Sequence, residues 1–121
     1  MLVVDDEDAI RFSMKEYFTT LGYQVDCARE MEEAQALLTK GHYTIVIVDL
    51  RLTGSHSAEG LKILAFVRER CPSTRVIVLT AYGSAKIEAE AWRLGVDSFM
   101  HKPIPLGQLA RIVLGLAQVE G

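Results

Sequence analysis

The chain has 121 residues, of which 50% are hydrophobic and 24% charged, and its formal net charge at pH 7 is −3. This length suits one domain with a buried core, so we expect residues 1–121 to form a single domain. The acidic balance argues against direct nucleic-acid binding by this domain, and no apolar stretch approaches the ~18 residues that span a bilayer. The first residues lack the pattern of a signal peptide, and Cys27 and Cys71 lack metal-binding spacing, so we expect free thiols in the cytoplasm.

Apolar residues in the first half of the chain alternate between strand and helix spacing. A strand of three apolar residues comes first, then a helix whose apolar residues recur every three or four positions. The same two patterns repeat, and a third strand of β-branched residues lacks polar alternation, which is typical of a strand buried on both faces. In chain order, the predicted elements are the strand Leu2–Val4, the helix 10–21, the strand Tyr23–Ala28, the helix 31–38 and the strand Ile45–Val48.

The second half continues this alternation after a polar segment at residues 51–59. The predicted elements are the helix 61–67, the strand Val76–Leu79, the helix 87–94, the strand Ser98–His101 and the helix 106–116. Five strands alternating with five helices predict an α/β fold, in which an open parallel sheet carries helices on both faces. The ligand site of such a sheet lies at the carboxyl ends of its strands.

Polar residues follow four of the predicted strands at that edge. They are Asp5 and Asp6 after the first strand, Asp49 after the third, Thr80 at the end of the fourth and Lys102 after the fifth. A single aspartate in such a place often caps a helix, but the joint pattern brings three carboxylates, a hydroxyl and an ammonium together. Crowded carboxylates raise each other's pKa values, and a divalent cation relieves their repulsion. Oxygen ligands of this kind suit Mg²⁺.

Four segments, LVVDDE at 2–7, IVDL at 47–50, VLTA at 78–81 and FMHKP at 99–103, together resemble the receiver domains of two-component response regulators. The resemblance covers nearly the whole chain and implies a CheY-like, flavodoxin-like doubly wound sheet with strand order 2-1-3-4-5. It implies a phosphorelay protein that accepts a phosphoryl group from a sensor histidine kinase or a histidine phosphotransfer protein. Such a domain is a regulator and not an enzyme, although it assists its own phosphorylation and dephosphorylation with Mg²⁺, or with Mn²⁺.

The resemblance also implies a role for each matching residue of the site. Asp49 matches the phosphoacceptor, which also contributes to the metal site. Asp6 matches the direct ligand of the metal ion, and Asp5 matches the acid that holds the ion through water. The backbone carbonyl of Arg51 matches the remaining protein ligand. Lys102 matches the lysine that pairs with the phosphoryl oxygens.

Further matches concern switching and output. Thr80 matches the switch hydroxyl, Phe99 the switch aromatic ring, and Pro103 a proline that follows a cis peptide bond from Lys102. The signalling surface would be formed by the fourth helix, the fifth strand and the fifth helix, where Trp92 is either a core residue or an interface residue. It would control an output domain or an effector protein, and two copies of the chain could pair through it.

The segment after the acceptor departs from the family pattern. Leu52-Thr53-Gly54 replaces the usual Met-Pro-Gly, and the next glycine, Gly60, comes about three residues late. Arg51 and Tyr82 match positions that flank the path of hydrolytic water. Because both are bulky here, we expect them to slow the loss of the phosphoryl group.

Several alternatives remain open. A degenerate receiver would serve only for protein contact. A haloacid-dehalogenase-type phosphotransferase needs a second acid two positions after the acceptor, where this chain has Arg51. A flavodoxin-like cofactor binder needs a phosphate-binding loop where this chain has Asp5-Asp6-Glu7. The stretch TAYGS at 80–84 looks like that of regulators that control sigma-54 transcription, but hybrid kinases also carry such receivers, so the output stays undefined.

Overall fold

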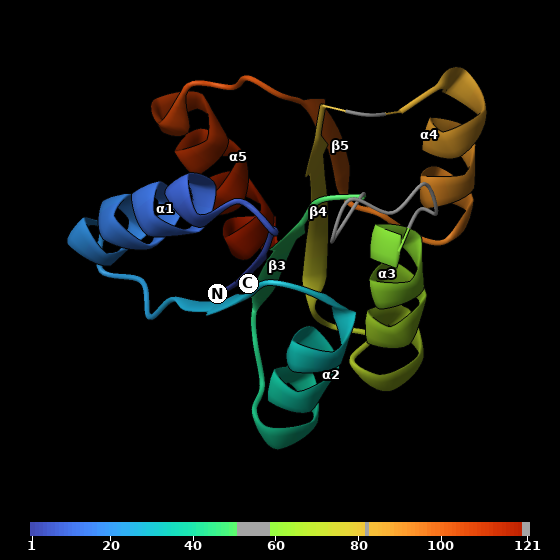
Figure 1. Ribbon diagram of the computed structural model, residues 1–121, viewed down its shortest axis with the longest axis horizontal. Helices are drawn as coiled ribbons and strands as arrows, with labels where there is room; N and C mark the ends of the chain where they lie inside the picture. The colour runs from blue at the N-terminus through green and yellow to red at the C-terminus, as the bar shows by residue number, and fades with distance from the viewer. Residues whose placement is uncertain (51–58, 82, 120–121) are drawn as a thin grey trace.

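The computed structural model describes residues 1–50, 59–81 and 83–119, and there five strands alternate with five helices (Figure 1). The strands form one parallel sheet in the predicted order β2-β1-β3-β4-β5. In chain order the elements are β1 (Leu2–Val4), α1 (Asp8–Thr20), β2 (Asp26–Ala28), α2 (Met31–Lys40), β3 (Ile45–Val48), α3 (Glu59–Arg70), β4 (Arg75–Thr80), α4 (Ala85–Arg93), β5 (Ser98–His101) and α5 (Leu106–Val119).

Strand β2 is shorter than predicted. The alternating pattern predicted a strand over Tyr23–Ala28, but the parallel ladder with β1 starts at the pair Leu2 and Asp26. Residues 23–25 therefore precede the ladder, although Val25 is buried and Cys27 packs into the same core, as their alternation predicted. Register with a neighbouring strand, and not polarity alone, sets the length of this strand.

The sheet has a hydrophobic core on each face. Helices α1 and α5 cover one face, and α2, α3 and α4 cover the other (Figure 1). Because successive residues of a strand point to opposite faces, Leu2 and Val4 belong to one core and Val3 to the other. All residues of β3 are buried, which explains why its sequence shows no polar alternation.

Two helices are followed by glycines with positive φ. Gly22 follows the last turn of α1 with φ +98°, and Gly95 follows α4 with φ +96°. Both lie in the left-handed region, which glycine enters without the steric penalty of a side chain.

Two expectations about the chain as a whole can be compared with the structure. Cys27 and Cys71 are free thiols, as expected. Within the described ranges, every helix is too short or too polar to cross a bilayer.

Candidate functional site

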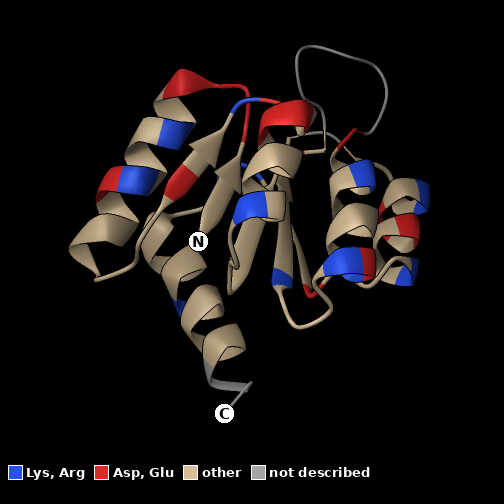
Figure 2. Ribbon diagram, turned by 90° about the horizontal axis from the view of Figure 1, so that it is seen from below, with Lys and Arg blue, Asp and Glu red and all other residues tan. Residues whose placement is uncertain are grey.

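Backbone register brings the acidic residues together at one edge of the sheet. Val4 of β1 is paired with Val48 of β3, so the residues that follow them, Asp5 and Asp49, emerge side by side. The Asp49 amide donates to the carbonyl of Val4 (2.9 Å), and the Asp5 amide donates to that of Ala28 (3.1 Å). These bonds extend the ladder beyond the strands and fix where the two side chains start. Acidic residues are prominent in the loops at this edge (Figure 2).

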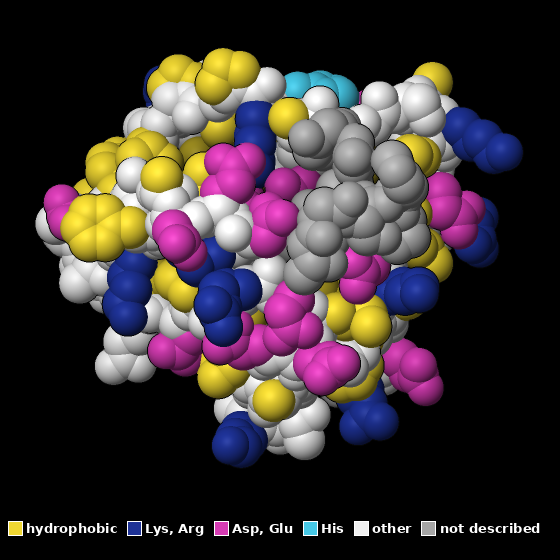
Figure 3. Space-filling view, viewed as in Figure 1, with side chains coloured by type: hydrophobic (Ala, Val, Ile, Leu, Met, Phe, Trp, Pro, Cys, Tyr) yellow, Lys and Arg dark blue, Asp and Glu magenta, His cyan; other side chains and the backbone are white. Residues whose placement is uncertain are grey.

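Three carboxylates form a compact cluster there. Asp5, Asp6 and Asp49 each offer an oxygen, and these oxygens all lie within 4.8 Å of one another. Asp5 and Asp49 are 4% and 3% exposed, whereas Asp6 is the more accessible member. Acidic side chains gather near the centre of this face of the molecule (Figure 3). A set of oxygen donors without nitrogen or sulfur fits a hard divalent cation such as Mg²⁺ or Ca²⁺.

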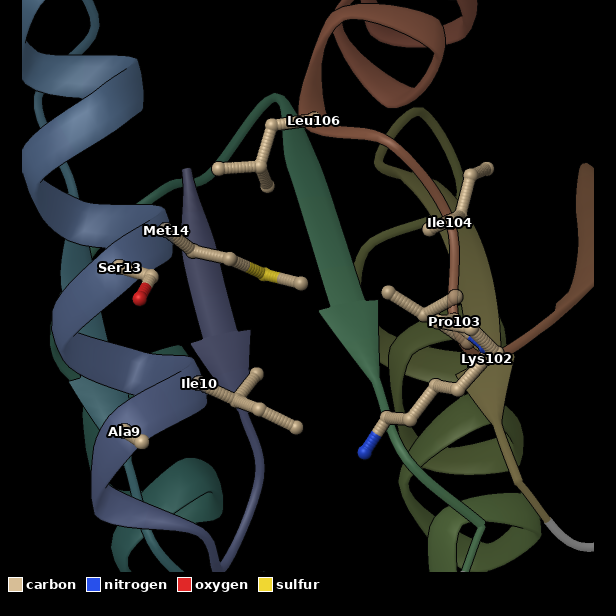
Figure 4. Close-up of a pocket in the computed structure, with 9 residues that line it drawn as sticks. Ala9, Ile10, Ser13, Met14, Lys102, Pro103, Ile104 and Leu106 are labelled. Carbon is tan, nitrogen blue, oxygen red and sulfur yellow. The ribbon is translucent and has the colours of Figure 1, made fainter.

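Lys102 connects two of these carboxylates. Its Nζ lies 2.7 Å from Asp5 Oδ2 and 3.0 Å from Asp49 Oδ2, and the side chain is 12% exposed. Figure 4 shows it extending from the segment after β5 toward the carboxyl ends of β1 and β3. Its amide donates to the carbonyl of Thr80 (2.9 Å), and its peptide bond to Pro103 is cis, as expected.

A pocket of about 280 Å³ lies beside the lysine (Figure 4). Its walls come mainly from α1 and from the segment that leads into α5, and they are mostly apolar. The lysine stem is therefore packed against hydrocarbon, while its ammonium group reaches the carboxylates. The pocket lining includes Ile10, Met14, Lys102, Pro103, Ile104 and Leu106.

Burial and hydrogen bonding change the ionisation of the site. Burial raises the pKa of Asp5, although hydrogen bonds from Lys102 and the Glu7 amide lower it, and the charge of Asp49 adds a smaller increase. The expected repulsion between carboxylates thus contributes, but burial is the main cause. Burial lowers the pKa of Lys102, and its contacts with Asp5 and Asp49 more than reverse this effect, so the pKa is raised overall. A charged lysine is therefore favoured between the two carboxylates.

Thr80 and Phe99 lie next to the same turn. Thr80 is fully buried at the end of β4, and Phe99 is half-buried on the neighbouring strand β5. Gly83 lies beside both, because a Cβ atom added there would be 3.4 Å from Phe99 Cζ and 3.9 Å from Thr80 Cγ2. The predicted switch hydroxyl of Thr80 and the predicted switch ring of Phe99 are therefore both neighbours of Gly83.

Sequence reasoning noted the late position of Gly60 but not its reason. A Cβ atom there would lie 2.3 Å from the carbonyl oxygen of Asp49 and 2.7 Å from Leu50 Cα. The Gly60 amide also donates to the carbonyl of Leu50 (2.9 Å). Helix α3 thus begins directly against the backbone of the predicted acceptor, a contact that only glycine permits.

Sequence reasoning missed Arg11. Its Nη1 donates to the backbone carbonyl of Asp5 (2.7 Å), and its Nη2 pairs with Asp8. An arginine in an amphipathic helix gives no sequence signal for this contact, since the same pattern is typical of a solvated surface position.

Some predicted site residues lie outside the described residues. These are Arg51 and Tyr82, together with Leu52-Thr53-Gly54. The ligand role of the Arg51 carbonyl and the effect of Arg51 and Tyr82 on phosphoryl lifetime therefore stay predictions.

Response regulators from several bacteria are similar to this chain in sequence. The response regulator protein PilR of Pseudomonas aeruginosa is 32% identical over 112 residues, which cover 93% of this chain and 24% of that protein. The sporulation initiation phosphotransferase F of Bacillus subtilis is 31% identical over 109 residues, which cover 90% of this chain and 86% of that protein. The chain thus spans about a quarter of PilR and most of phosphotransferase F.

Solved structures show the same fold. A CheY-like response regulator receiver domain protein from Methanospirillum hungatei has a TM-score of 0.88 and 27% identity over 99% of this chain and 96% of that one. A response regulator from Burkholderia pseudomallei, solved with a phosphorylated aspartic acid, a calcium ion and citrate, has a TM-score of 0.83 and 28% identity. That match covers 90% of this chain and 62% of the other.

The family model for the response regulator receiver domain matches residues 1–114, nearly the whole chain. The sheet order, the carboxylate cluster and the lysine at the strand ends agree with this match. The chain therefore belongs to the response regulator receiver domain family.

Proposed function

We propose that residues 1–121 act as one receiver domain that accepts a phosphoryl group on Asp49 from a sensor histidine kinase or a histidine phosphotransfer protein. The observation that carries this proposal is the Lys102 ammonium group, which contacts both Asp5 and Asp49 within a cluster of three carboxylates. This combination supplies a nucleophile, a cation for the phosphoryl oxygens and ligands for a divalent metal. It supports a phosphate-accepting receiver over a degenerate one that serves only for protein contact.

The transfer step needs an ionised acceptor. A carboxylate oxygen of Asp49 would attack the phosphorus of a phosphohistidine, forming an O–P bond while the P–N bond breaks. The electron pair leaves with the imidazole, which takes up a proton from solvent. The Lys102 ammonium, 3.0 Å from Asp49 Oδ2, would donate to a phosphoryl oxygen and offset charge in the transition state.

Asp5, Asp6 and Asp49 would hold Mg²⁺, or Mn²⁺, in different ways, which their contacts support. Both oxygens of Asp5 already accept hydrogen bonds, one from Lys102 and one from the Glu7 amide (2.9 Å), which suits contact with the ion through water. The carboxylate of Asp6 has no recorded partner in the described part of the chain, which suits direct ligation together with Asp49. When bound, the ion would add positive charge beside the phosphoryl oxygens.

Output would pass through the surface of α4, β5 and α5. Phosphoryl contacts with Thr80 would bias the packing of Phe99, which is a population shift between two arrangements. Trp92 on α4 is 48% exposed, so its ring is available for a partner, and its indole N–H donates to Glu88 Oε2 (3.4 Å). The partner would be an output domain, an effector or a second copy of this chain, in the cytoplasm. An output domain that regulates transcription is one such partner.

Phosphorylation of the purified protein tests the proposal. Acetyl phosphate with Mg²⁺ should add one phosphoryl group to the wild type, detected by intact mass, and chelation of Mg²⁺ should prevent it. Asp49→Asn should stay unmodified, whereas Asp8→Asn, which removes a nearby exposed carboxylate, should react like the wild type. A wild type that gains no mass but still binds a partner protein would support the degenerate receiver instead.

The lifetime of the product tests the two positions beside the water path. If Arg51 and Tyr82 shield the acyl phosphate, an Arg51→Asn, Tyr82→Glu double variant should lose its phosphoryl group faster than the wild type. Equal decay rates would contradict this part of the proposal.

A further inference from the structure

Arg11 contacts the loop that carries both acidic residues of β1. Its Nη1 donates to the carbonyl oxygen of Asp5 at 2.7 Å, and its Nη2 pairs with Asp8. The Arg11 side chain is 13% exposed, whereas that of Asp8 is 91% exposed. The guanidinium group is therefore packed against the loop and is not a solvated charge on the outside of α1.

The bonded carbonyl belongs to the peptide that joins Asp5 to Asp6. Asp5 is already fixed on its other side, because its amide donates to Ala28 and its Oδ1 accepts from the Glu7 amide. At the start of α1 the N-cap residue, Glu7, supports the loop through its backbone amide only, since its side chain makes no capping bond. Arg11 thus holds the Asp5–Asp6 peptide, and the Glu7 amide holds the Asp6–Glu7 peptide through its bond to Asp5.

The Asp6 carboxylate depends on this backbone. Asp5 and Asp49 are held by Lys102, but among the described residues no hydrogen bond or ion pair is recorded for the Asp6 side chain. Its oxygen nonetheless lies within 4.8 Å of oxygens of the other two carboxylates. The direction in which it points is consequently set by the two peptides that flank Asp6, and Arg11 holds the first of them.

We propose that Arg11 is a positioning residue that presets Asp6 for Mg²⁺ and so favours Mg²⁺ over Ca²⁺. This inference rests on the proposed metal site. Mg²⁺ demands nearly ideal octahedral geometry, whereas Ca²⁺ tolerates irregular ligands at longer distances. Loosening Asp6 therefore weakens Mg²⁺ binding more than Ca²⁺ binding.

A purely electrostatic role predicts the opposite result. A guanidinium group near three carboxylates repels any incoming cation, so removing its charge would strengthen the binding of both ions by a similar factor. The ratio of the Mg²⁺ and Ca²⁺ dissociation constants thus separates positioning from charge, and a general loss of stability would not change that ratio in this direction.

The experiment measures metal affinity without any phosphorylation. Binding of Mn²⁺ is followed by the loss of its free-ion EPR signal, and Mg²⁺ and Ca²⁺ are then titrated as competitors. Arg11→Met should weaken Mg²⁺ binding by roughly tenfold or more, the usual range for residues that orient metal ligands, and weaken Ca²⁺ binding clearly less. Arg11→Lys keeps the charge and one donor but loses the planar fork, so its ratio should be intermediate.

Two matched controls come from the same helix. Lys15→Met removes an exposed positive charge from α1 and should leave the Mg²⁺ to Ca²⁺ ratio unchanged. Asp8→Ala removes the outer partner of Arg11 but keeps its bond to Asp5, and it should also keep the wild-type ratio.

The possible results can be told apart. An Arg11→Met variant with an unchanged ratio, or with tighter binding of both ions, overturns the role of Arg11. If far-UV circular dichroism shows that this variant does not fold, Arg11→Lys decides, and a wild-type ratio there overturns the inference as well. Failure of the wild type itself to bind Mn²⁺ overturns the proposed metal site, and with it this inference.

Discussion

Replacing Gly60 with alanine should destabilise the protein, although alanine is normally preferred in a helix. Gly60 lies in the first turn of α3, where helix propensity alone predicts a gain of about 1 kcal/mol. The added Cβ atom, however, would lie 2.3 Å from the carbonyl oxygen of Asp49, 2.7 Å from Leu50 Cα and 2.9 Å from the carbonyl carbon of Asp49. All three are backbone atoms, so no side-chain rotation can relieve the overlap.

The size of the effect follows from these two opposing contributions. Overpacking of a closely packed region costs about 1–3 kcal/mol, and the upper end applies here because two backbone segments must separate. Subtracting the helix gain of about 1 kcal/mol leaves a net loss of about 2 kcal/mol in the free energy of unfolding. Since the displaced backbone carries Asp49, phosphorylation by acetyl phosphate should also slow in the folded variant.

Urea unfolding followed by circular dichroism measures the loss, and Gly115→Ala is the matched control. Gly115 also lies in a helix, α5, but a Cβ atom there would meet nothing within 4 Å. That variant should gain up to about 1 kcal/mol and keep the wild-type phosphorylation rate. A Gly60→Ala protein at least as stable as the wild type would refute the reasoning that close backbone contact fixes this residue.

Other predictions concern pH and the supports of the site. The pKa of Asp5 is raised above its ordinary 3.8, so protons should compete with Mn²⁺ at a higher pH than at an exposed aspartate. In EPR titrations at limiting Mn²⁺, a loss of Mn²⁺ binding with its midpoint at or below pH 3.8 would contradict this. The pKa of Lys102 is raised above 10.5, so its contacts should stabilise the fold below that pH and be lost as the pH rises through the higher folded value; urea titrations of Lys102→Met should lack this alkaline loss. Asp97→Ala should cost about 3 kcal/mol in urea unfolding, because it removes the carboxylate that pairs with Arg68 and accepts from the Val76 amide; a loss under about 1 kcal/mol would contradict this. Gly83→Ala should cost about 1–3 kcal/mol, because φ is +155° there, and a wild-type melting temperature would argue against strain at this turn.

The strand ends could be predicted because the apolar pattern of each strand and the polar residues that follow it indicate the same boundary. The uniformly apolar, β-branched run Ile45–Val48 is typical of a strand buried on both faces, and the structure buries all four residues. Because the strands are parallel, Asp5, Asp49 and Lys102 are expected to meet at one edge of the sheet. In the structure the Lys102 ammonium lies within hydrogen-bond distance of both carboxylates.

Other features depend on tertiary contacts that local patterns do not encode. The length of β2 follows from where the ladder with β1 begins, and not from the polarity of residues 23–25. The need for glycine at position 60 follows from the approach of α3 to the end of β3. The contact between Arg11 and the carbonyl of Asp5 joins a helix to a loop six residues away in sequence, at a position where a surface arginine would look the same.

The strand that leads to Asp49 and the strand that carries Phe99 differ in how readily they open. Strand β3 is bonded to neighbours on both sides and is buried throughout, whereas in the described part of the chain β5 is bonded only to β4 and has no fully buried residue. Amide hydrogens of β3 should therefore exchange with solvent only when the whole sheet unfolds, while those of β5 exchange through local opening. If Asp49 accepts a phosphoryl group as proposed, the change at the carboxyl end of β3 can consequently alter the fluctuations of β5 while the centre of the sheet stays intact.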